Sequence, residues 1–201
     1  MNRRRIFVMI ALAALVAGAA ALVYAQNEID NSPLAAADQM VTTATEAPGQ
    51  APKVLYDFNA LPDPVKRMLE QIVVAAQSGE IETMRPVLES NELKPMVTVA
   101  YVEDPIEFWK KASTDGAGRD VLAAMLNVIA SGYVRVGQGQ DEMFVWPYFA
   151  EIDLATLTPS QEVDLYRIVP SSLAVPMKKA GKYNYYRLGI SPTGVWHYFI
   201  Q

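Results

Sequence analysis

Residues 181–200, which read GKYNYYRLGISPTGVWHYFI, decide the fold class. Two runs rich in aromatic and branched side chains, 182–190 and 195–200, flank the tetrapeptide Ser191-Pro192-Thr193-Gly194. Proline in the second position and glycine in the fourth favour a type I turn, so the stretch predicts an antiparallel hairpin. Side chains alternate along a strand. The face expected to pack on the core carries Tyr186, Leu188 and Ile190, and the other face carries Tyr183, Tyr185 and Arg187.

A second hairpin is predicted upstream of the first. Residues 133–136 and 142–146 are strand-like runs on either side of the glycine-rich turn 137–141, and Pro147 ends the second run. The two hairpins together predict an antiparallel sheet of about four strands.

Helices are predicted between and before these hairpins. Their start signals are an aspartate followed by proline at residues 63 and 104, and a capping box from Thr158 to Gln161. Apolar residues at helical spacing or terminating Gly and Pro residues support helices at 63–76, 81–89, 104–111, 119–131, 158–168 and 172–179. The chain is therefore expected to be an α+β protein, with a helical layer packed on a small antiparallel sheet.

The first 25 residues have the order of a secretory signal. A basic start, Asn2-Arg3-Arg4-Arg5, precedes twenty residues without charge, and small residues lead to a cleavage site between Ala25 and Gln26. This predicts a periplasmic or otherwise extracytoplasmic protein. The alternative is an uncleaved anchor, because residues 6–25 are long enough to span a bilayer. In that case the protein is held at the inner membrane by this segment alone.

The remaining chain divides into a linker and one domain. Residues 26–53 contain no Phe, Tyr or Trp and no sustained apolar period, so we expect a disordered linker. Residues 54–201 have the size of a single domain.

Composition excludes several function classes. The absence of cysteine among the 201 residues rules out disulfides and thiolate chemistry, and the single histidine rules out sites built on several imidazoles. The formal charge is −5, and loss of residues 1–25 would remove three of the 17 basic residues and no acidic one, leaving −8. Nucleic acid is therefore not an expected partner, and the sequence indicates no metal or cofactor.

Half of the aromatic residues cluster in the predicted hairpins. A sheet surface with tyrosines beside a cation suits stacking on a glycan, a peptide or a protein. The candidate contacts to a ligand or partner are Trp146, Tyr148, Tyr185, Arg187 and His197.

The segments EMFVWPYFAEIDLATLTPSQEVDLYRIV and GKYNYYRLGISPTGVWHYFI carry a resemblance. Their aromatic Val-Trp-Pro-Tyr-Phe stretch, Leu-Thr-Pro helix start and Tyr-Arg-x-Gly-Ile-x-Pro-x-Gly-x-Trp hairpin resemble the C-terminal region of a family of uncharacterised exported proteins from alphaproteobacteria. The resemblance covers roughly the last 60 residues. It implies a bacterial envelope setting, and it brings no activity and no catalytic residue with it.

Three functions are compatible with these patterns. The first is a non-catalytic binding or interaction module of the cell envelope, whose partner is a protein, peptide or glycan. The second is a periplasmic hydrolase using carboxylates, or His197 with a serine, although no Gly-x-Ser-x-Gly motif is present. The third is a membrane-tethered structural domain.

Overall fold

The computed structural model describes residues 51–201. The predicted signal segment, residues 1–25, and nearly all of the predicted linker lie outside the described residues. Within residues 51–201, no helix is both long enough and apolar enough to cross a membrane.

The fold is α+β, as predicted. The helices are α1 (Asp63–Gln77), α2 (Met84–Ser90), α3 (Pro105–Ala112), α4 (Arg119–Ile129), α5 (Pro159–Ile168) and α6 (Ser171–Ala180). The strands are β1 (Val134–Val136), β2 (Met143–Trp146), β3 (Arg187–Ile190) and β4 (Trp196–Ile200). They form one antiparallel sheet in the order β1-β2-β3-β4. Short 3-10 turns fill several connections, at Phe58–Ala60, Ile81–Thr83, Gly139–Asp141, Tyr148–Glu151 and Leu154–Thr156.

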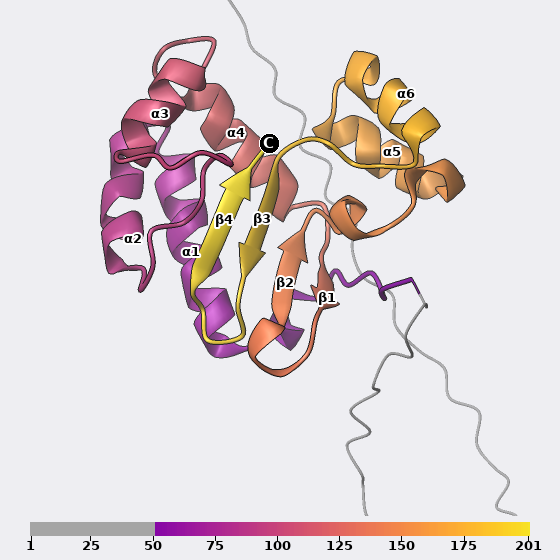
Figure 1. The fold of residues 1–201 in the computed structure, drawn as a ribbon, viewed down its shortest axis with the longest axis horizontal. Helices are drawn as coiled ribbons and strands as arrows, with labels where there is room; N and C mark the ends of the chain where they lie inside the picture. Colours follow the sequence, from indigo (N-terminus) through magenta and orange to yellow (C-terminus); the bar gives the residue numbers. More distant parts are fainter. Residues whose placement is uncertain (1–50) are drawn as a thin grey trace, which may run out of the picture. The chain divides into compact units, whose positions relative to one another are not determined.

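One face of the sheet is covered by the first four helices (Figure 1). The apolar side of each helix meets sheet residues whose side chains point the same way. Trp109 of α3 stacks on Trp196 of β4 with ring centroids 6.2 Å apart, and Leu188 and Ile190 are fully buried in the same cluster. This confirms the predicted core face of the last hairpin, with Tyr186 partly buried against the cluster.

The opposite face of the sheet is covered over β1 and β2. Val134 and Val145 pack there in a second cluster with Phe149, Leu165 and Met177, which the chain between β2 and the end of α6 supplies. The sequence predicted one helical layer only. The structure adds α5 and α6 as a separate helical pair (Figure 1). Strand β2 is therefore buried on both faces, whereas Arg135 of β1 is exposed, and β3 and β4 have helices on one face.

The last hairpin differs from its prediction at one end. Its turn is as predicted, with the Gly194 N–H donating to the Ser191 carbonyl at 2.9 Å. The strand expected over 182–190, however, begins only at Arg187. Its neighbours end there: β2 ends at Trp146, opposite Leu188, before Pro147, which has no N–H to donate, and β4 ends at Ile200, opposite Arg187. Residues 182–186 therefore have no partner strand in the described part of the chain.

Candidate functional site

The five predicted contact residues do not form one surface. Trp146 and Tyr148 are fully buried, because β2 and the turn after it lie between the two apolar clusters. They belong to the core, which corrects their assignment as contact residues. The Trp146 indole N–H and the Tyr148 hydroxyl have no hydrogen-bond partner among residues 51–201.

Tyr185, Arg187 and His197 are half-exposed. Tyr185 packs edge-on against Tyr186, with ring centroids 4.9 Å apart. Burial raises the pKa of Tyr185, and the charge of Asp120 at the start of α4 adds to the effect. His197 occupies the irregular position of β4, where the register with β3 shifts.

Arg187 lies on the face of β3 and β4 opposite the first four helices, and no helix of residues 51–201 covers that face (Figure 1). No carboxylate of residues 51–201 lies within ion-pair distance of its guanidinium. Partial desolvation raises the pKa of Glu151, an exposed residue, and Arg187 opposes that rise. Burial together with the charge of Glu151 raises the pKa of Tyr198 to about 12, and Arg187 again opposes it. These three side chains therefore share one electrostatic neighbourhood.

Tyr198 covers the backbone of the neighbouring strand. It stands opposite Gly189, and a Cβ atom at that position would overlap the tyrosine ring. Glycine in a strand leaves backbone uncovered, and an aromatic side chain on the adjacent strand can protect it. The ring of Tyr198 is therefore part of the open face of the sheet.

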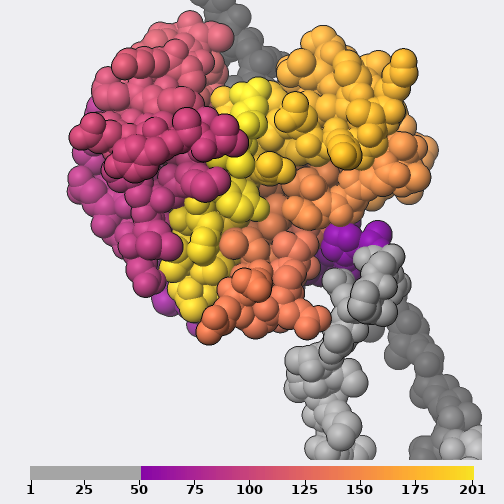
Figure 2. Space-filling model, viewed as in Figure 1, coloured from indigo at the N-terminus to yellow at the C-terminus, as the bar shows by residue number. Residues whose placement is uncertain are grey.

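A loop that the sequence did not single out borders this face. The loop comprises residues 94–103 and is closed by the Lys94 ammonium, which donates to the Glu103 carbonyl at 2.5 Å. Met96 forms a parallel bridge with Tyr198: its N–H donates to the His197 carbonyl and its carbonyl accepts from the Phe199 N–H, both at 2.8 Å. In Figure 2 the magenta atoms of this part of the chain reach the yellow atoms of the last strands.

The loop presents apolar side chains to solvent. Val99 is 91% exposed and Tyr101 is 86% exposed, while Met96 and the preceding Leu93 are 52% and 56% exposed. Val97, between them, is buried in the core and anchors the loop. The sequence feature that could have indicated this exposed loop is the largely apolar run from Met96 to Val102, which has no helical period and no predicted partner strand.

Both ends of the 94–103 loop are fixed. Before it, the Asn91 side chain accepts from the Trp196 N–H at 2.9 Å and donates to the Trp196 carbonyl at 2.7 Å. After it, Asp104 caps α3 by accepting from the Ile106 N–H at 2.9 Å.

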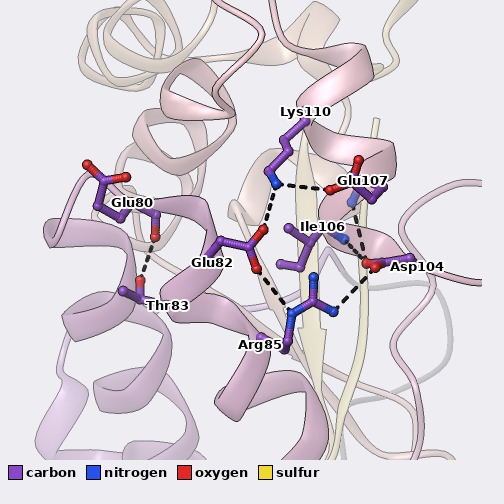
Figure 3. Close-up of polar contacts among 8 residues, drawn as sticks. All are labelled: Glu80, Glu82, Thr83, Arg85, Asp104, Ile106, Glu107 and Lys110. Carbon is purple, nitrogen blue, oxygen red and sulfur yellow. Dashed lines mark hydrogen bonds and ion pairs between the residues drawn. The ribbon is translucent and has the colours of Figure 1, made fainter.

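Asp104 also joins a charged network between α2 and α3 (Figure 3). Arg85 bridges Glu82 and Asp104 at 3.1 and 3.3 Å, and Lys110 bridges Glu82 and Glu107 at 2.5 and 2.9 Å. Exposed pairs of this kind stabilise little individually. Their arrangement holds the start of α3, and with it the end of the loop, against α2.

His197, the base of the hydrolase alternative, has no nucleophile hydrogen-bonded to it within residues 51–201. The His197 imidazole makes no hydrogen bond to a serine or carboxylate of residues 51–201, as a base with an activated nucleophile would. A small cavity between α4 and α5 is lined by Asn127, Ala130, Ser131, Asp164, Arg167 and Ile168, with one carboxylate only. In the described part of the chain, no three metal-ligating side chains are grouped to hold an ion.

No family model, curated protein or solved structure matches the chain. The functional argument therefore depends on the geometry of the open sheet face and the 94–103 loop.

Proposed function

We propose that the folded domain is a non-catalytic binding module of the cell envelope. Its contact surface is the 94–103 loop together with the adjoining side chains of β4. The observation that carries the proposal is the exposure of Val99 and Tyr101, at 91% and 86%, on a loop held at both ends.

This arrangement is what a contact surface requires. Apolar groups gathered on the surface commonly mark a site of association, and tyrosine is among the residues that contribute most to binding. Compact loops with closely spaced ends often carry function. The Met96 N–H and carbonyl are both hydrogen-bonded to β4, so the loop is already ordered before a partner binds. Binding therefore avoids the entropy cost of ordering a free chain.

The test is a selection of ligands for the purified protein from a random peptide library and an oligosaccharide array. The loop variant Val99→Ser/Tyr101→Ser is compared with the control Val74→Ser/Val163→Ser, whose original side chains are 68% and 62% exposed on α1 and α5. We expect to find ligands that bind the loop variant at least about tenfold more weakly than the parent and bind the control with the affinity of the parent. Ligands that bind both variants equally, or the absence of any ligand, would refute the proposal.

Export depends on the predicted signal at residues 1–25 and has its own measurement. Mass analysis of the protein recovered from the envelope is expected to find a chain that begins at Gln26. A chain that begins at Met1 would instead favour the tethered domain. No observation favours the hydrolase.

A further inference from the structure

We infer that the partner of the 94–103 loop is a polypeptide segment that carries basic side chains among apolar ones. The inference rests on the proposed function, because it names the chemistry of what the same surface binds.

Three exposed carboxylates adjoin the apolar side chains along the chain, one in the 94–103 loop and two in the segment that leads into it. Glu89, Glu92 and Glu103 have no lysine or arginine within ion-pair distance among residues 51–201. The neighbouring network behaves differently, since Glu82, Asp104 and Glu107 are all paired (Figure 3).

Residues 89–103 hold these three carboxylates and one basic residue, a net charge of −2. The basic residue, Lys94, donates to the carbonyl oxygen of Glu103 and not to a carboxylate. The surface therefore combines exposed apolar groups with an excess of negative charge. A partner that buries Val99 and Tyr101 must approach these carboxylates, so lysines or arginines beside its apolar side chains make the approach favourable.

The charge distribution disfavours a second copy of this chain and an anionic lipid surface as occupants of the loop surface. A second copy would bring the same carboxylates against their counterparts, and residues 51–201 hold 18 acidic and 14 basic residues, a net charge of −4. An anionic lipid surface would be repelled in the same way.

The experiment measures binding of the purified protein to three labelled twelve-residue peptides by fluorescence anisotropy. In each peptide, every second residue is leucine or tyrosine. The residues between them are lysine in the first peptide, glutamate in the second and serine in the third. Each titration is run at low and at high salt, because screening weakens attraction between exposed charges. Sedimentation of the protein alone and mixing with phosphatidylcholine vesicles test self-association and lipid binding.

We expect the lysine peptide to bind tightest at low salt and to lose most of its advantage at high salt. The variant Glu92→Gln/Glu103→Gln is expected to bind it about 2- to 30-fold more weakly, from two exposed charge pairs. The control Glu70→Gln/Asp141→Asn changes the net charge equally at exposed residues far along the chain from the loop. It is expected to bind within about twofold of the parent.

Equal binding of the serine or glutamate peptide would overturn the inference. So would a dimer or a vesicle complex that Val99→Ser/Tyr101→Ser abolishes. If all three peptides bind the parent equally but do not bind the loop variant, the inference of a basic partner is wrong, while the proposed binding function is supported. If the loop variant binds every peptide as well as the parent does, the proposed function fails as well.

Discussion

Replacing Asn91 by alanine is expected to release the segment that leads into the 94–103 loop from β4. The Asn91 amide occupies the place of a neighbouring strand, because it accepts from the Trp196 N–H at 2.9 Å and donates to the Trp196 carbonyl at 2.7 Å. Its amide also donates to the Leu93 carbonyl. The substitution removes these contacts and leaves two main-chain groups of β4 without their partner.

The expected loss of stability follows from the two bonds to Trp196. A hydrogen bond contributes about 0.5–1.5 kcal/mol net, so Asn91→Ala is expected to lower the free energy of unfolding by about 1–3 kcal/mol. In a domain of this size, each kcal/mol corresponds to about 2–4 °C. The midpoint of thermal unfolding should therefore fall by about 2–12 °C.

Urea denaturation followed by tryptophan fluorescence measures the global effect. Trp109 and Trp196 are buried and stacked against each other, so their emission reports loss of the core. Hydrogen exchange measures the local effect at the Met96 and Phe199 amides, whose bonds join the loop to β4. Both amides are expected to exchange faster in the variant.

Asn184→Ala is the control, because Asn184 is exposed and its side chain makes no hydrogen bond in the described part of the chain. It should leave the free energy of unfolding within about 0.5 kcal/mol of the parent. If Asn91→Ala behaves like this control and the exchange at both amides is unchanged, the amide does not hold the loop, and the reasoning is refuted.

Three further substitutions test the surroundings of the site. Asp104→Ala removes the cap of α3 and should lower the free energy of unfolding by about 1 kcal/mol in urea denaturation; Asp104→Asn, which can still cap, should cost less. Partial desolvation raises the pKa of Glu151, which is an exposed residue, so ionised Glu151 disfavours the folded state only slightly above that pKa and has no effect below its ordinary pKa of about 4.5. Glu151→Gln should therefore stabilise the protein by a small amount at pH 7, with a gain that disappears by about pH 3; a gain independent of pH would contradict this cause. Gly189→Ala should displace the ring of Tyr198 and cost about 1–3 kcal/mol, and a crystal structure of the variant with that ring unmoved would contradict the overlap.

Local signals in the sequence predicted the elements well because their causes are local. The capping box from Thr158 to Gln161 is present in the structure, and the Ser191–Gly194 turn joins the last two strands. Helix 119–131 was predicted to Ser131 and ends at Ile129, two residues early. Residues 81–89 form a 3-10 turn followed by α2.

The candidate site was predicted less well because exposure is not a local property. Trp146 and Tyr148 were assigned to a surface, yet both are fully buried, Trp146 in the cluster under the first four helices and Tyr148 in the second cluster. Alternation along a strand separates its two faces, but it cannot show whether one face or both are covered. Arg187 and His197 do lie at the surface, half-exposed.

The sequence by itself determined the class of the fold, the two hairpins and most helix starts, since capping, turn chemistry and periodicity act over a few residues. Only the tertiary structure decided which apolar side chains are covered and which are presented. In the run from Met96 to Val102, Val97 is buried in the core, whereas Val99 and Tyr101 are exposed. That division depends on bonds from Asn91 and Met96 to β4, about one hundred residues along the chain. Its physical reason is that long-range pairing fixes the backbone of the loop, and the backbone then fixes the direction of each side chain.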